Sequence, residues 1–253
     1  MIKTTLGCIA TLWFTANGFG QIEISTETQE SESPKSEEVK APKSHYERST
    51  TDFVLYANWS NTTRKLIENP ANGGIYAEPL GTRVDETSLN CWSFGFAFKD
   101  RILPHLTWEG GISFIKNGES YAYNAPDSTY EYQTSYHYIG MPFKAYYTLG
   151  DKIQFFAGGG VVPELFVRYR QNIRIVDSNN TETTEEVETQ NGYSTFVFSV
   201  AANVGVQASL GKRMSLLLMP EYRLQLSSSY VESADYAHYA RAIGFNMGLT
   251  FNL

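Results

Sequence analysis

The sequence contains no apolar run long enough to cross a membrane as a helix. A spanning helix needs about 20 consecutive, mostly apolar residues, and no window of the 253 residues approaches that length. The chain is therefore not a helical membrane protein. Basic residues are also few, because 20 Lys and Arg stand against 27 Asp and Glu, for a net charge of -7. Nucleic-acid binding needs clustered Lys and Arg to replace phosphate counterions, so this balance argues against it.

Cysteine and histidine are scarce. Of the two cysteines, Cys8 lies in the N-terminal segment, which leaves Cys91 alone in the rest of the chain. Once the N-terminal segment is cleaved as an export signal, as predicted below, an internal disulfide is excluded, and we expect Cys91 to be a small buried side chain. His45, His105 and His238 show no metal-ligand spacing. The sequence accordingly predicts no metal, no cofactor and no catalytic residue.

The first 50 residues differ in composition from the rest. Residues 1–20 combine a basic start at Lys3 with an apolar run over residues 6–14 and small residues near the end, a pattern that predicts a cleaved export signal. Residues 21–50 are rich in Glu and have almost no large apolar side chains. Such a segment cannot bury enough surface to offset its chain entropy, so we expect an acidic, disordered periplasmic tether. The folded domain is predicted to cover residues 51–253.

That domain repeats a period of two. Eight segments alternate large apolar residues with small or polar ones, as strands with two different faces do. They span residues 52–60, 91–99, 106–114, 138–149, 153–170, 195–210, 214–226 and 244–253. Several are longer than the five or six residues typical of soluble strands, and about ten residues of tilted strand cross a bilayer.

The links between these segments alternate in length. Three are short, at residues 100–105, 150–152 and 211–213, and four are long, at roughly residues 60–88, 117–134, 171–193 and 228–238. Short periplasmic turns and long outer loops are typical of an up-and-down membrane barrel, whereas a Greek-key sandwich gives no reason for the alternation. We therefore predict an all-β fold, an eight-stranded antiparallel up-and-down transmembrane β-barrel. It is expected to be a monomer in the outer membrane, with the tether and the C-terminus periplasmic.

Three prolines, Pro142, Pro163 and Pro220, fall inside the proposed strands. Each removes a donor from a ladder, and a closed barrel has no edge strand to accommodate it. We expect bulges or local gaps at these positions.

Parity directs a set of charged side chains into the barrel. Eight strands leave an interior that side chains fill, and an unpaired charge in a dry interior would cost several kcal/mol. We therefore expect a plugged lumen with a compensated charge network in which Glu109 pairs with Lys144 on the neighbouring strand; an ion path lined by the same charges is the alternative. The predicted network consists of Glu109, Lys144, Glu164, Arg168, Glu221 and Arg223.

Two further features concern the wall and the long loops. Ser135 and His137 share the predicted lipid-facing side, a spacing that suits part of a Ser–His unit, but no acidic partner follows from parity, and a polar pair at the rim is favoured. Six tyrosines flank the turn sequence NAPDS, and they predict either an adhesive hairpin beyond the membrane or an aromatic girdle. They are Tyr121, Tyr123, Tyr130, Tyr132, Tyr136 and Tyr138. The acidic residues in 171–193 favour a solvated loop over a calcium site, because regular ligand spacing is missing.

The domain resembles the outer-membrane β-barrel family common in Bacteroidetes, to which PorT-like proteins belong and which is built like the small OmpX and OmpA barrels. The likeness covers residues 51–253 and lies in YIGMPFKAYY, FFAGGGVVPELF and the closing IGFNMGLTFNL. The first strand departs from the family in lacking glycines, and the chain ends in Leu253 instead of an aromatic residue.

This resemblance implies an integral outer-membrane protein of the porin family type with a structural, adhesive or envelope-assembly role. It also implies that the last strand closes the barrel and is recognised by the barrel assembly machinery. The apolar residues of that assembly strand are Phe245, Met247, Leu249, Phe251 and Leu253. Outer-membrane lipid and lipopolysaccharide are the other expected partners. A lipid-modifying outer-membrane enzyme, a narrow porin and a soluble lipocalin-like barrel are the alternatives.

Overall fold

A computed structural model describes residues 51–69 and 79–253. The strands are β1 (Asp52–Glu68), β2 (Thr87–Leu103), β3 (Leu106–Asn124), β4 (Thr129–Gly140), β5 (Phe143–Leu149), β6 (Ile153–Val176), β7 (Glu182–Thr189), β8 (Phe196–Ser209), β9 (Met214–Gln225) and β10 (Tyr236–Asn252). A short 3-10 helix, η2 (Gly81–Val84), precedes β2. Within the described ranges, no helix has the length and apolar character needed to span a membrane. The predicted export signal and tether lie outside the described residues.

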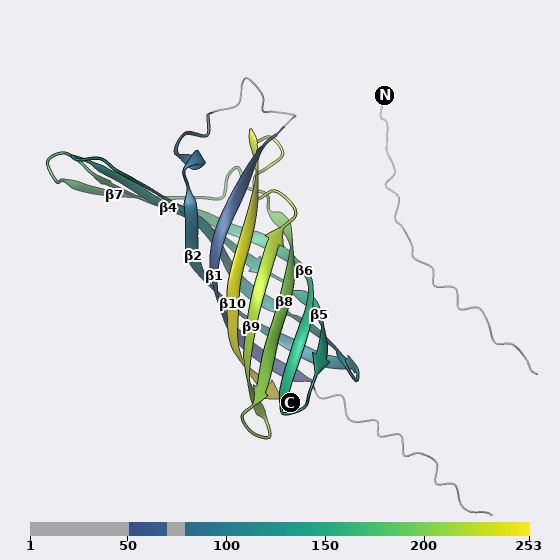
Figure 1. The fold of residues 1–253 in the computed structure, drawn as a ribbon. Coiled ribbons are helices and arrows are strands. Elements are labelled where there is room, and N and C mark those ends of the chain that lie inside the picture. Colours follow the sequence, from purple (N-terminus) through teal and green to yellow (C-terminus); the bar gives the residue numbers. More distant parts are fainter. Residues whose placement is uncertain (1–50, 70–78) are drawn as a thin grey trace, which may run out of the picture. The chain divides into compact units, whose positions relative to one another are not determined.

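The strands form a closed antiparallel ring. Their order is β2-β1-β10-β9-β8-β6, then β4 and β5 end to end, then β3, which pairs again with β2 (Figure 1). β4 and β5 both pair with β3 on one side and β6 on the other, so together they make one wall strand. The ring therefore has eight strands when β4 and β5 are counted as one, and β7 pairs with β6 outside it. The predicted up-and-down barrel is confirmed.

Ring closure depends on the ladder between the first and last strands. All 17 residues of β1 have partners in β10, from Asp52 opposite Asn252 to Glu68 opposite Tyr236. Leu253 then donates its backbone N–H to the carbonyl of Thr51. Thr51 and Leu253 therefore lie at the same end of the barrel as the short links, and we call this the turn end and the opposite one the loop end.

The three prolines lie at gaps in the ladders, as expected. Pro142 interrupts the wall strand between β4 and β5, and Pro163 lies across from that interruption on β6, where its carbonyl accepts a hydrogen bond from the Met141 N–H at 2.8 Å. Pro220 lies where the β8–β9 register omits two pairs, between Asn203↔Glu221 and Val206↔Leu218. A missing N–H is thus tolerated where the neighbouring strand makes no ladder bond.

The two faces of the wall have opposite polarity. Large apolar side chains such as Leu55, Phe96 and Val204 are exposed on the outside, while Asn58, Ser93 and other polar side chains are buried inside. This is the reverse of a soluble barrel and is the arrangement of a transmembrane one.

Small residues make room for large ones inside this narrow ring. A Cβ added to Gly95 would lie 2.6 Å from the phenol ring of Tyr56, and one added to Gly205 would lie 2.5 Å from the ring of Phe156. These two glycines let aromatic rings lie against the inner wall.

β3 and β4 continue past the ring as a hairpin, one of the two predictions for the tyrosine-rich segment, with Tyr123 opposite Tyr130. β6 is longer than the sequence predicts and continues to Val176, and β7 turns the predicted acidic loop into a second hairpin. β3, β4, β6 and β7 consequently extend past the ring side by side (Figure 1). We call their outer portions, residues 119–124, 129–134, 171–176 and 182–187, the projecting sheet.

Substitution of Val204 tests the orientation of the wall. Val204 is 57% exposed on the outer face of β8, so Val204→Arg should lower the free energy of unfolding by about 2–4 kcal/mol, because it places a charge near the bilayer midplane. Thr63→Arg is the matched control: Thr63 is also exposed, on β1, two outward-facing positions beyond Trp59 toward the loop end, and should cost about 0–1 kcal/mol. Urea unfolding from phospholipid vesicles measures both, and equal costs would contradict the face assignment.

Candidate functional site

The middle of the lumen holds a buried charge network centred on Glu221 of β9. The Lys144 ammonium, on β5, donates to Glu221 Oε2 at 2.8 Å. The side-chain amides of Asn203 and Asn246 donate to the same oxygen at 3.0 and 3.2 Å. Three other strands, β5, β8 and β10, thus direct polar groups to one carboxylate, which is the condition for burying it without a large penalty.

Arg223 extends this network toward the loop end. Its guanidinium donates to Asn117 Oδ1 at 2.9 Å and lies 3.7 Å from Glu221 Oε1 and 4.0 Å from Glu164 Oε1. Glu164 is fully buried, and Arg223 supplies its ion pair. Arg223 therefore neutralises two carboxylates on different strands.

Glu109 does not form the predicted pair with Lys144. The two are direct cross-strand partners, and Lys99 is the partner of Glu109 on the other side. The Lys144 side chain nevertheless reaches across the lumen to Glu221, while Glu109 accepts a hydrogen bond from Tyr146 at 3.3 Å. In a ring this narrow the opposite wall is within reach of a long side chain, so adjacency on neighbouring strands does not decide the pairing.

Lys99 belongs to the interior as well. It is buried, and its ammonium lies over the rings of Tyr146 and Phe156, 5.1 and 4.8 Å from their centroids. Such cation–π contacts partly replace the hydration that burial removes. Lys99 and Cys91 are an even number of residues apart on β2, so alternation places both side chains on the same face. That pattern indicates a lumen-facing Lys99.

Arg168 is the predicted network member that the structure places outside the lumen. A β-bulge inserts Val167, since His137 pairs with Arg168 but Tyr138 pairs with Phe166. The extra residue reverses parity beyond it, so the Arg168 side chain is about one-third exposed and lies 3.4 Å from Glu188. The assignment to the lumen was wrong because strict alternation was carried through the bulge.

Side chains occupy the middle of the lumen, and a cavity of about 190 Å³ lies at the turn end, lined by residues that include Lys99, Thr107 and Gln207. Three cations, Lys99, Lys144 and Arg223, balance three carboxylates, Glu109, Glu164 and Glu221. Apolar clusters lie on both sides of this layer. The cluster nearer the turn end consists of Val54, Ala97, Tyr146, Phe156, Leu217 and Met219, and the one nearer the loop end of Ile115, Tyr136, Tyr138, Val162, Val197 and Ala201.

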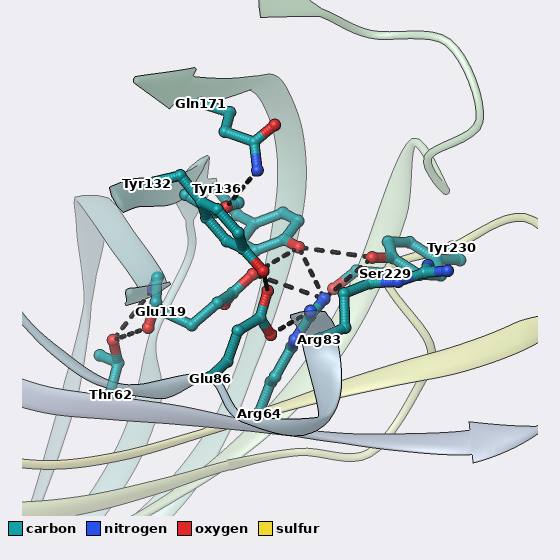
Figure 2. A network of polar contacts seen from close by, with 12 residues as sticks. Thr62, Arg64, Arg83, Glu86, Glu119, Tyr132, Tyr136, Gln171, Ser229 and Tyr230 are labelled. Carbon is teal, nitrogen blue, oxygen red and sulfur yellow. Dashed lines mark hydrogen bonds and ion pairs between the residues drawn. The ribbon is translucent and has the colours of Figure 1, made fainter. Parts of the chain in front are cut away.

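A second polar network closes the loop end of the lumen; we call it the rim network (Figure 2). Arg64 of β1 forms ion pairs with Glu86 and Glu119, the latter at 3.4 Å. Tyr136 donates to Glu119 at 2.9 Å, and Arg64 donates to the Tyr230 hydroxyl at 3.1 Å. The rim network therefore joins β1, β3 and β4 to the two loops that precede β2 and β10.

One tyrosine of the hairpin ties down the segment around η2. Tyr132 donates to Glu86 at 2.7 Å and its hydroxyl is 3.0 Å from that of Thr82 (Figure 2). All six predicted tyrosines lie at positions whose parity continues the lumen face of β3 and β4. An aromatic girdle would face lipid, so that interpretation is wrong for these residues.

The projecting sheet has two unlike faces. Tyr121, Tyr130 and Tyr132 cluster on the face that continues the lumen, with ring centroids 5.3–6.1 Å apart, and further apolar side chains of this face are exposed. They are Tyr123, Ile175 and Val187. The opposite face, which continues the outer wall, carries ion pairs such as Arg174 with Glu182 at 2.9 Å and Arg170 with Glu186 at 3.0 Å.

The Ser–His alternative finds no supporting geometry. Ser135 and His137 lie on the outer side of β4, as predicted, but both are buried, and neither ring nitrogen of His137 has a hydrogen-bond partner among the described residues. The imidazole ring packs against the ring of Phe114, with centroids 5.5 Å apart. A nucleophile activated by this histidine would need the hydrogen bond that is missing.

Metal-ligating side chains do not gather either. Across residues 51–69 and 79–253, no three His, Cys, Asp or Glu side chains are placed to hold a metal ion. His238 is buried at the rim beside the ring of Tyr136, with centroids 4.6 Å apart. His105 lies in the exposed β2–β3 turn, with Nδ1 3.2 Å from the Thr148 carbonyl.

Comparison with solved structures finds small outer-membrane proteins. The chain is 12% identical to Neisserial surface protein A, with a TM-score of 0.43, covering 80% of this chain and 97% of that one. For Ail, the attachment invasion locus protein of Yersinia pestis, the values are 8%, 0.35, 81% and 99%. For the outer membrane protease OmpT from Escherichia coli they are 11%, 0.37, 81% and 97%.

These likenesses indicate nothing about the activity of this chain. The fold assignment rests on the ladders of the ring. No protein-family model matches the sequence, and a search of curated proteins finds no match. Membership of the PorT-like group therefore stays a prediction.

A double-mutant cycle tests the lumen pairing. Lys144→Met leaves Glu221 without its closest cation and should destabilise the barrel by about 3–5 kcal/mol. The double variant Lys144→Met, Glu221→Gln should recover much of this loss, because it leaves no orphan charge. Lys144→Met with Glu109→Gln is the matched control and should recover less. Urea unfolding in vesicles measures all of them.

Small, additive losses in this cycle would contradict a dry plug. A hydrated pore would keep the remaining charge in water, and it would pass a steady current in planar bilayers that changes with the lumen charge. The filled interior instead predicts no substantial steady conductance for the unmodified protein.

The hairpin between β6 and β7 has a pH-sensitive turn. Backbone N–H groups of Thr181 and Asn179 each donate to Asp177 Oδ1 at 2.8 Å. The bond from Thr181 is the larger cause, and together the two bonds hold the pKa of the Asp177 carboxyl below its usual 3.8. The lowered pKa means that the carboxylate stabilises the turn fully above about pH 4. The stabilisation is lost as pH falls through the depressed pKa.

We expect the Thr181 and Asn179 amide resonances to titrate together, with a midpoint below 3.8. Asp177→Asn keeps an acceptor but cannot ionise, so its amide shifts should stay flat over the same range. A midpoint at or above the usual value would show that the turn hydrogen bonds do not form in solution.

Proposed function

We propose that this protein is a display barrel of the outer membrane of a Gram-negative bacterium, which anchors the projecting sheet and presents its aromatic face to a partner outside the cell. The apolar wall supports membrane insertion. The filled, charge-balanced lumen supports an anchor instead of a channel. The single observation that carries the proposal is the apolar, tyrosine-rich face of a sheet that continues past the ring.

The orientation follows from the connections. Short turns at one end and long loops at the other are arranged in outer-membrane barrels with the turns in the periplasm. We infer that the turn end, with Thr51 and Leu253, is periplasmic, so that the tether before residue 51 lies there too. The assembly strand β10 then presents Phe245, Met247 and Leu249 toward lipid, which suits recognition by the barrel assembly machinery.

The aromatic face suits a protein partner. Tyr side chains offer large contact area with little rotamer entropy to lose, and their hydroxyls hydrogen-bond at a wet interface. Tyr123, Ile175 and Val187 are all exposed, so these apolar atoms face water unless a partner covers them. An adhesive or assembly role fits this surface better than the alternatives. The enzyme alternative lacks a hydrogen-bonded Ser–His unit, and a lipocalin-like barrel would bury the wall residues that are exposed.

Site-specific cross-linking in intact cells tests the proposal. A photoreactive amino acid at Tyr123, on the aromatic face, should yield discrete cross-linked species with an external or envelope protein. The matched control places it at Arg174, on the charged face of the same sheet, where cross-links should be far fewer. Equal cross-linking from the two faces, or none from Tyr123, would overturn the proposal.

The orientation has its own control. Tyr123→Cys should react with a membrane-impermeant maleimide in whole cells, whereas Lys212→Cys, in the β8–β9 turn, should react only after lysis. Cys91 is buried and does not interfere. The opposite labelling pattern would place the projecting sheet in the periplasm.

A further inference from the structure

A row of basic side chains lies directly above the apolar wall on three neighbouring strands. Phe114, Ile139 and Leu165 are cross-strand partners and form the last exposed apolar row of β3, β4 and β6. In the next outward-facing row, Lys116 pairs with His137, which pairs with Arg168. The row after that brings Arg170 opposite Ser135.

The charge of this surface is concentrated where lipid headgroups meet a barrel. Side chains at the end of an apolar band lie at headgroup level, and basic residues there contact phosphates. Three permanent or near-permanent cations, Lys116, Arg168 and Arg170, flank a single imidazole on a patch of three strands. We call Lys116, His137, Arg168 and Arg170 the cationic row.

The imidazole in the middle of the row is not satisfied by the protein. His137 is only 7% exposed, and neither Nδ1 nor Nε2 has a hydrogen-bond partner among the described residues. A buried polar group of this kind costs free energy unless something outside the chain bonds to it. An anionic oxygen held between the flanking cations would accept the imidazole N–H.

Nearby glutamates do not neutralise the row strongly. Arg168 and Arg170 lie 3.4 Å from Glu188, and Arg170 also lies 3.0 Å from Glu186, but these side chains are 36–51% exposed. Exposed ion pairs of this kind contribute little to stability because water screens them. A phosphate monoester, with three acceptor oxygens and a charge of about −1.5 to −2 at pH 7, competes well for the same guanidinium groups.

We propose that the cationic row binds the phosphate of an anionic lipid headgroup in the leaflet at the loop end. The lipid chains lie against the Phe114, Ile139 and Leu165 row, while the phosphate oxygens accept hydrogen bonds from Lys116, His137 and the two arginines. The inference rests on the proposed membrane placement but not on the partner-binding role. In the proposed orientation this leaflet is the outer one, whose phosphorylated glycolipids carry the required group.

Lipid retention measures this site. The barrel is folded into phosphatidylcholine nanodiscs containing a minor fraction of phosphatidic acid, and the bound anionic lipid is counted by native mass spectrometry. The triple variant Lys116→Gln, Arg168→Gln, Arg170→Gln should lose retention by about tenfold or more, since each charge-assisted bond contributes more than a neutral one. His137→Phe, which keeps the packing against Phe114 but removes the N–H, should lose part of it.

Two controls separate a built site from overall charge. Arg174→Gln removes a cation from the same face of β6, two outward positions beyond Arg170, and Lys65→Gln removes one from the exposed side of β1; both should retain lipid normally. Glu188→Gln should raise retention, because it frees the arginines. If Arg174→Gln or Lys65→Gln lost as much lipid as the triple variant, binding would depend on overall charge and the site would be refuted.

A further arm identifies the source of the phosphate. Inorganic phosphate at millimolar concentration should displace little lipid, because the chains contribute through the apolar row. Equal displacement by free phosphate would assign the row to a soluble anion and overturn the lipid proposal. Heat-modifiable migration on gels confirms that each variant is folded and inserted, so that failed insertion, which would count against the membrane placement, is distinguished from loss of the site.

Discussion

The hydrogen-bonded ladder between β1 and β10 is the contact on which the rest of the structure depends. Without it the sheet would present two rows of unpaired backbone groups to lipid, where no water could satisfy them. Closure of the sheet with eight strands then fixes the width of the lumen. A lumen this narrow leaves no bulk water around Glu164 or Glu221. The buried charges must therefore be paired within the protein, which they are through Lys144 and Arg223. Lipid outside and paired charge inside are two results of the same closure.

Much of this fold follows from the sequence, for identifiable reasons. Alternation over the wall segments determines which side of each strand meets lipid, and the alternating link lengths determine the topology. The prolines predicted the gaps in the ladders, because a residue without a backbone N–H cannot donate a ladder hydrogen bond in any strand. The hairpin of β3 and β4 also followed from the turn sequence NAPDS. The end of β6 was less predictable, because its polar sequence beyond the apolar band is compatible with either a strand or a loop.

The details of the site depended on geometry that alternation does not contain. Parity correctly brought five of the six predicted charges inside, yet it could not decide that Lys144 reaches Glu221 across the lumen instead of its neighbour Glu109. That choice depends on side-chain length compared with the width of the ring. The rim network was also missed, because Arg64, Glu86 and Glu119 come from segments that the sequence assigned to loops (Figure 2).

The bulge at Val167 determines which side chains of β6 face outward beyond it. Val167 is the extra residue between Phe166 and Arg168, which pair with the adjacent residues Tyr138 and His137. If Val167 instead paired with His137, strict alternation would turn Arg168 and Arg170 into the barrel and Tyr169 toward the outside. Whether one extra residue is accommodated as a bulge or within the ladder therefore determines whether this part of the outer surface is basic or aromatic.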